Sequence, residues 1–190
     1  MSERVLTKIL VYDLPSENFK ALENTQERDK VRNIRVQCVQ KLHKLGLQCT
    51  ESVILISPSR LNRVNQTIER VYQRYEELKR EISHLIPQNN FTPIIRVLDL
   101  TQSQQETFTL LAKRRLQERI DESIERINEI ILAIEEITQE EKRRVLRYRL
   151  NQLRKEWKTI QECSRELGID VSRDLEFLLD LIDDARGRLE

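Results

Sequence analysis

The chain has 190 residues, of which 34% are charged and 38% hydrophobic, and its formal net charge at pH 7 is +1. This composition argues against a disordered chain, and the near-neutral balance means that any contact with a polyanion must come from local clusters of cations. No segment approaches the ~20 uninterrupted apolar residues of a membrane span and no secretion signal opens the chain, so we expect a cytoplasmic protein without membrane contact.

The first elements predict a strand followed by a helix. Residues 4–13 end in an apolar, β-forming run before Pro15, which is typical of a strand. Between residues 28 and 45 the apolar side chains recur every three or four positions, which predicts a helix with one buried face. Gly46 is the expected C′ glycine of that helix.

Two strands, a second helix and a last strand follow. Residues 47–51 and 52–57 predict a hairpin or a kinked pair, and the second of these strands is apolar enough for the centre of a sheet. Ser59 is the expected cap of a helix with buried positions from 61 to 82, and residues 94–100 predict the last strand. The order βαββαβ is that of the ferredoxin-like fold.

Helical periodicity dominates the rest of the chain. It runs from about Ser103 to Ile137, and residues 138–141 then match a capping box that starts a second helix, which stops at Gly168. The tight connection predicts an antiparallel hairpin of two ~45 Å helices with Trp157 packed on the seam. Ser172 is the expected cap of a last helix that is too apolar to be a free tail.

We therefore expect an α+β protein with a ferredoxin-like βαββαβ head at residues 1–100. A long antiparallel α-helical hairpin at 101–167 and a short acidic C-terminal helix at 168–190 complete it. The last segment holds seven acidic and three basic residues, so residues 1–167 carry a net charge of +5. The last helix should dock on the hairpin, on the head or on a partner subunit.

Cysteine and histidine usage excludes several kinds of catalytic and metal site. Cys38, Cys49 and Cys163 are odd in number and far apart, which predicts reduced thiols that serve as small core residues. His43 and His84 stand alone on separate predicted helices. No metalloprotease, zinc-ribbon or phosphate-loop motif occurs in the sequence, so those classes lose their support.

Two predicted helices carry clusters of basic residues that are candidates for nucleic-acid binding. They are Arg32, Arg35 and Lys41 on the first helix, beside Arg28, Lys30 and Lys44, and Arg143, Arg144, Arg147 and Lys155 on the second arm of the hairpin. Such residues neutralise phosphates and give salt-dependent binding. The alternative is a solvated face, on which the cations pair with Glu three or four residues away or, for the hairpin, with Glu135 and Glu136 of the facing arm.

Several short segments of the first hundred residues carry a resemblance to a known family. They are the sequence from Ile9 to Pro15, Arg35-Val36, Lys41-Leu42, Leu45-Gly46-Leu47 and Ser52-Val53. This pattern resembles the small CRISPR-associated adaptation and endoribonuclease subunit, whose fold is reused in phenylacetate-degradation repressors and in the N-terminal domain of chromate-resistance regulators. The resemblance covers about residues 4–100. The insertion at 16–30 and the whole of 101–190 depart from the compact CRISPR subunit, and the hairpin is closer to the chromate-resistance type.

The resemblance to the CRISPR subunit implies a role for Asp13. In that family the matching carboxylate helps to hold a divalent metal at a dimer interface, and Mg²⁺ or Mn²⁺ would there activate a hydroxide for phosphodiester attack. The alternative is that Asp13 ends the strand and caps the turn before Pro15, since Asp is common in turns.

Three functions remain open. The first is a non-enzymatic, dimeric, nucleic-acid-associated regulator resembling the chromate-resistance type, which has no cofactor, dimerises through the sheet edges of the head and binds DNA or RNA with its basic helices. The second is an interaction protein whose helical hairpin and acidic helix bind a protein partner or assemble copies of the chain. The third is a metal-dependent nuclease that uses Asp13 across a dimer. We rank them in that order.

Overall fold

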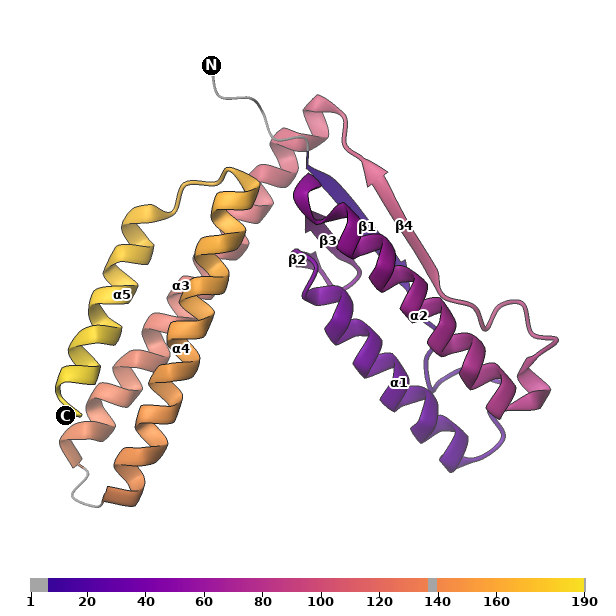
Figure 1. Cartoon of the computed structure of the whole chain (residues 1–190), viewed down its shortest axis with the longest axis horizontal. Helices are drawn as coiled ribbons and strands as arrows, with labels where there is room; N and C mark the ends of the chain where they lie inside the picture. Colours follow the sequence, from indigo (N-terminus) through magenta and orange to yellow (C-terminus); the bar gives the residue numbers. More distant parts are fainter. Residues whose placement is uncertain (1–6, 137–139, 190) are drawn as a thin grey trace. The chain divides into compact units, whose positions relative to one another are not determined.

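The computed structural model describes residues 7–136 and 140–189 (Figure 1). The chain divides into two compact units, Met1–Glu106 and Thr107–Glu190, which we call the head unit and the hairpin unit. The boundary between them falls inside one long helix, α3 (Gln102–Glu136).

The head unit contains a four-stranded antiparallel sheet with the order β2-β3-β1-β4. The strands are β1 (Lys8–Asp13), β2 (Leu47–Thr50), β3 (Val53–Ile56) and β4 (Ile94–Asp99). Two helices, α1 (Thr25–His43) and α2 (Leu61–Glu81), run side by side over one face of this sheet (Figure 1). The mixed helix-and-sheet class is confirmed, and β3 lies next to β1 at the centre, as its apolar sequence predicted.

The core of the head unit lies between the sheet and the two helices. Leu10 of β1 and Ile54 of β3 are partners in the register, and both are fully buried in this core. Alternate residues point to the opposite face of the sheet. On that face β4 exposes Ile94 and Leu98, by 55% and 45%.

Gly46 has a different role from the predicted one. Its φ is not positive, so it is not a left-handed C′ residue. Instead, a Cβ at this position would lie 1.9 Å from the backbone oxygen of Leu55 in β3, so only glycine allows the chain after α1 to pass so close to that strand. The helix also starts earlier than predicted, because the Asn24 side chain caps it by accepting from the Glu27 amide at 2.9 Å.

Two predicted serine caps are also wrong. A short 3-10 turn, Pro58–Arg60, precedes α2, and the Ser59 hydroxyl bonds to Ser57 Oγ at 2.9 Å instead of capping the helix. At the start of the last helix, Ser172 is the first helical residue and the cap position, Val171, makes no side-chain cap bond, while the Asp170 carboxylate accepts from the Ser172 amide at 3.0 Å in a turn before the helix.

The hairpin unit consists of α3 together with α4 (Glu140–Leu167) and α5 (Ser172–Gly187). Gly168 stops α4 as predicted, with a φ of 65°. The predicted capping box at residues 138–141 includes Thr138 and Gln139, which lie outside the described residues. A similar pair that the prediction missed starts α3, where the Gln104 side chain accepts from the Thr101 amide at 2.9 Å.

The last helix docks on the hairpin, which was one of the three predicted locations. Trp157 of α4 packs against α5 and donates from its indole nitrogen to the Leu175 carbonyl at 2.8 Å. Arg154 of α4 pairs with Asp183 of α5 at 3.6 Å. The hairpin unit is therefore a bundle of helices rather than an isolated pair of arms.

Candidate nucleic-acid interface

The three candidate cations of α1 lie on its solvent-facing side. Arg32, Arg35 and Lys41 are all exposed, and no ion pair within 4 Å joins any of them to an acidic residue of the described chain. Two of their neighbours are engaged instead. Lys30 pairs with Glu81 of α2 at 3.5 Å, and Arg28 donates to the Leu22 carbonyl at 3.5 Å.

A cavity of about 410 Å³ opens between the end of α1 and the start of α2. Its basic lining comes from both helices and is Lys41, Lys44, Arg63 and Arg70. The other lining residues are Leu45, Gln66 and Thr67, so no carboxylate faces this space. We call these four cations the head cluster.

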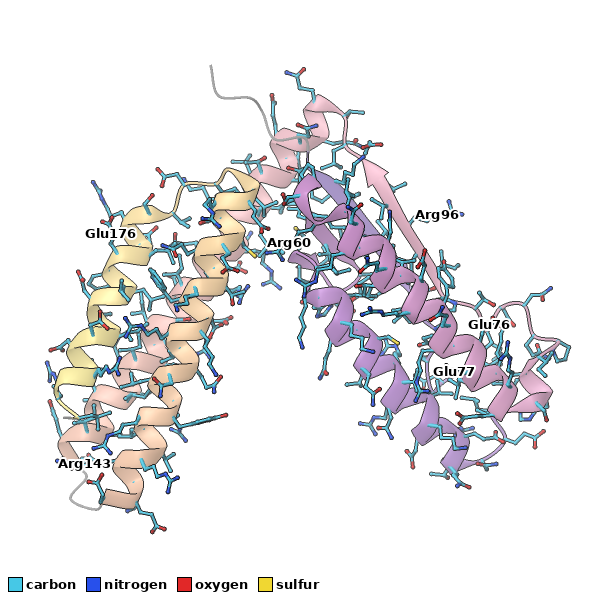
Figure 2. All side chains as sticks on the ribbon, viewed as in Figure 1. Arg60, Glu76, Glu77, Arg96, Arg143 and Glu176 are labelled. Atoms are coloured by element: carbon cyan, nitrogen blue, oxygen red, sulfur yellow. The ribbon has the colours of Figure 1, made fainter. Side chains whose placement is uncertain are left out.

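The head cluster has few acidic groups near it in sequence or in ion pairs. Residues 33–68 contain a single acidic residue, Glu51, and Glu69 directly precedes Arg70 without lining the cavity. Over the described part of the chain, no ion pair within 4 Å engages a member of the cluster. Arg60, labelled in Figure 2, lies beside it and donates to the Lys44 carbonyl at 3.4 Å, which ties the start of α2 to the end of α1.

Sequence reasoning found only part of the head cluster. Lys41 was a candidate, whereas Arg63 and Arg70 of α2 were not. The sequence does contain the spacing that places these cations on common helix faces. Arg63 and Arg70 are seven residues apart and therefore share one face, and Lys41 and Lys44, three residues apart, share another. What the sequence does not contain is the pairing of these two faces across the groove between the helices.

The candidate cations of α4 fall into two groups. Arg144 and Lys155 are exposed and Arg143, labelled in Figure 2, is half-buried, and within residues 7–136 and 140–189 none of the three has an ion-pair partner. Arg147 differs, because it pairs with Glu140 at 2.9 Å and donates to the Leu189 carbonyl at 3.3 Å. Arg147 therefore ties α4 to the end of α5.

The acidic residues of the facing arm do not neutralise α4. Glu156 is the one carboxylate between residues 142 and 159, and it is held by Arg126 at 2.8 Å and Arg119 at 3.7 Å, both from α3. Glu135 of α3 pairs with Arg188 of α5 at 3.6 Å. The alternative of a face neutralised by salt bridges therefore does not describe Arg144 or Lys155.

Asp13 is exposed at the end of β1, where it pairs in register with Ile94. It borders a cavity of about 520 Å³ that Ser16 and Asn18 also line. Across the part of the chain that the structure describes, no three His, Cys, Asp or Glu side chains lie close enough together to hold a metal ion. A metal here would need further ligands from a second chain, so the metal-dependent nuclease stays a prediction.

The two histidines form hydrogen-bond contacts within the fold, and the three cysteines are free thiols. His43 Nε2 lies 2.7 Å from the Tyr12 hydroxyl, and burial lowers the pKa of His43 more than its contact with the Glu51 carbonyl raises it. His84 Nε2 lies 2.9 Å from the Ala21 carbonyl. The cysteines are free thiols, as predicted, and Cys38 and Cys163 are buried whereas Cys49 is partly exposed.

The described helices include none that is long and apolar enough to cross a membrane.

Comparison with known proteins identifies no relative of this chain. No protein-family model, no curated protein and no solved structure matches the chain. The resemblance over residues 4–100 therefore stays a prediction, and the case for a function depends on the geometry of the basic surfaces.

Proposed function

We propose that the chain is a non-enzymatic, nucleic-acid-associated regulator that holds the phosphate backbone of DNA or RNA with the head cluster. One observation carries the proposal: four cations from two helices line one cavity that has no carboxylate in its lining. Phosphate oxygens would neutralise this charge and release counterions, which is the dominant sequence-independent contribution to nucleic-acid affinity. Lys and Arg at such a site position the ligand without reading its sequence.

The start of α2 supports an anionic ligand at the same place. The N-terminal end of a helix carries a partial positive charge, which acidic side chains in the first turn usually offset. The first turn of α2 has no acidic residue and instead contains Arg63. An anion bound in the cavity would stabilise both the helix end and the arginine.

The arrangement of the head unit supports a ferredoxin-like layout and a dimer. The order β1-α1-β2-β3-α2-β4 and the strand order β2-β3-β1-β4 support the proposal of a split βαβ arrangement. We propose that two copies associate through the sheet edges, which are β2 and β4. The exposed Ile94 and Leu98 of β4 favour the second edge. Such a dimer would carry two head clusters, as we propose for a regulator resembling the chromate-resistance type.

A mobility-shift experiment tests the nucleic-acid proposal. The full chain is titrated into labelled duplex DNA and duplex RNA of about 25 base pairs at about 50 and about 200 mM salt. If the four cations each neutralise one phosphate, the logarithm of the affinity falls with the logarithm of the salt concentration with a slope of about −3.6, which weakens binding about a hundredfold over this range. Absence of binding at the lower salt would end the proposal.

Charge reversal locates the interface. The double variant Lys41→Glu and Arg63→Glu should lose binding at the lower salt, because it replaces attraction by repulsion at the cavity. The matched control is Arg80→Glu with Arg96→Glu, which makes the same change of net charge in the same unit. Arg80 lies ten residues beyond Arg70 on α2, about 15 Å along the helix, and Arg96 projects from β4 (Figure 2). An equal loss of affinity in both double variants would contradict the assignment to the head cluster.

A further inference from the structure

A stripe of solvent-exposed side chains runs along α4 of the hairpin unit. Its members recur at steps of four and three residues and are Arg144, Tyr148, Asn151, Lys155 and Lys158, all exposed. At 100° per residue these positions fall within a sector of about 80°, and at 1.5 Å per residue they extend over about 21 Å. They therefore form one continuous surface, opposite the buried positions Leu146, Leu150 and Leu153.

The cations of this stripe are not neutralised within the hairpin unit. Arg144, Lys155 and Lys158 have no ion-pair partner within 4 Å among the described residues. Glu156, the one carboxylate within residues 144–158, is already held by Arg119 and Arg126 of α3, and Glu141 and Glu162 flank the two ends of the stripe. The stripe is thus a linear array of positive charge on a rigid helix.

Tyr148 lies in the middle of this array with 64% of its surface exposed. Val145, one turn earlier on the same side of the helix, is 52% exposed, so the aromatic ring has an apolar neighbour at its edge. A single exposed aromatic residue needs no special explanation. Here, however, the exposed ring lies between two cations on the same face: Arg144 is four residues before it and Lys155 is seven residues after it. This combination is a more specific indication of a binding surface than an exposed ring alone.

A small cavity of about 140 Å³ lies alongside the stripe, between α4 and α5. Its apolar lining comes from Leu150, Ile182 and Leu189, and its polar lining from Asn151 and three arginines, Arg147, Arg154 and Arg186. Asn151 belongs both to the stripe and to the cavity. An apolar floor with an amide and guanidinium groups around it suits a flat group with polar edges.

We infer that this face of α4 binds unpaired nucleotides, with Tyr148 as the stacking platform and Arg144, Lys155 and Lys158 as the phosphate contacts. Proteins bind single strands by combining a positive track for the backbone with aromatic rings on which the bases stack, and stacking needs the base faces that a duplex hides. The inference goes beyond the head cluster, because it concerns a second surface, in the other unit, and a different form of nucleic acid.

The test measures the binding of fluorescein-labelled oligothymidylate and oligouridylate, each of 15 nucleotides, to the full chain by fluorescence anisotropy at about 50 mM salt. Loss of one stacked base by Tyr148→Ala should weaken binding about tenfold, whereas Tyr148→Phe, which keeps the ring, should stay within about twofold. Binding to either oligonucleotide supports the inference, and the two arms distinguish DNA from RNA.

The matched control is Phe177→Ala. Phe177 of α5 is 54% exposed, and although Arg173 lies four residues before it, its other charged neighbours are the acidic Asp174, Glu176, which Figure 2 labels, and Asp180. This variant should bind like the unchanged chain. Ultraviolet crosslinking to the oligonucleotide followed by peptide mapping should place the adduct within residues 144–158.

Three outcomes would overturn the inference: no binding of either oligonucleotide, unchanged binding by Tyr148→Ala, or an equal loss with Phe177→Ala. The head variant with Lys41→Glu and Arg63→Glu separates this inference from the proposed function. It should lose duplex binding and keep oligonucleotide binding that depends on Tyr148. If duplex binding depends on the head cluster but Tyr148→Ala changes nothing, only the inference about α4 fails.

Discussion

The two basic surfaces of this protein are built in different ways. The head cluster gathers four cations around a cavity from the end of one helix and the start of another. The stripe on α4 aligns its cations along a single helix and places an exposed tyrosine among them. The first arrangement suits a compact group such as a backbone phosphate, and the second suits an extended strand with accessible bases.

The comparison teaches that a count of basic residues does not measure a binding surface. On α4, Arg147 and Arg154 belong to the same basic run as Arg144, yet Arg154 pairs with Asp183 of α5 and Arg147 donates to the Leu189 carbonyl, so both hold the bundle together. In the head unit, Arg63 and Arg70 are far from Lys41 in sequence and line the same cavity. The ion-pair partners of each cation, rather than its position in a run, distinguish a structural residue from a binding residue.

The largest expected effect is a loss of stability of the head unit, which carries the head cluster. Gly46→Ala should destabilise the head unit by about 3 kcal/mol or more, because the new Cβ would lie 1.9 Å from the backbone oxygen of Leu55 and backbone cannot move aside cheaply. Urea denaturation followed by circular dichroism measures this change. Gly187→Ala is the control, because nothing lies within 4 Å of a Cβ there, and it should be neutral or slightly stabilising. Equal stability of the two variants would contradict the close approach.

The next effect concerns the salt dependence of duplex binding. Lys44→Gln with Arg70→Gln removes two of the four cations of the head cluster and should halve the salt slope, from about −3.6 to about −1.8. Arg144→Gln with Lys155→Gln removes two cations of the stripe and should leave the duplex slope unchanged while it weakens oligonucleotide binding. If both double variants lower the duplex slope equally, the two surfaces do not act separately.

A smaller effect should separate structural from binding arginines on α4. Arg147→Ala should lower the free energy of unfolding of the hairpin unit by about 1 kcal/mol, because it removes a hydrogen bond to the Leu189 carbonyl and the ion pair to Glu140. Arg144→Ala should change it by less than about 0.5 kcal/mol, as surface substitutions usually do. Thermal denaturation of the full chain compares the two variants. Equal losses would mean that Arg144 also has a structural partner.

The smallest effect is a pH dependence confined to the head unit. Burial lowers the pKa of His43 in the folded chain, so the unfolded chain binds a proton more readily. The stabilisation from the neutral ring is present above about pH 6.5 and is lost as the pH falls through the folded pKa. His43→Gln should therefore show a smaller fall in melting temperature between about pH 7.5 and 5.5 than the unchanged chain, and an equal fall would contradict this role.

Local patterns predicted most of the elements but few of their ends. The apolar, β-forming runs of β1 and β3 were sufficient to predict two strands, and the run of β3 also predicted its central place in the sheet. Ser59 and Ser172 were both wrong as caps, because a side-chain cap depends on whether the preceding backbone brings the hydroxyl to an amide, and in both cases another contact was closer. The glycine after α1 was recognised as necessary, but the reason was a neighbouring strand.

The sequence alone determined where the helices and strands lie and which residues face the core, because hydrophobic periodicity follows from the geometry of each element. It also placed basic residues on α1 and α4. Only the tertiary structure decided which cations remain available, since Arg147 donates to the Leu189 carbonyl beyond the end of α5 and Glu156 pairs with Arg126 of α3. The head cluster likewise exists only because α1 and α2 pack side by side, and electrostatics depends on distance in space and not on distance along the chain.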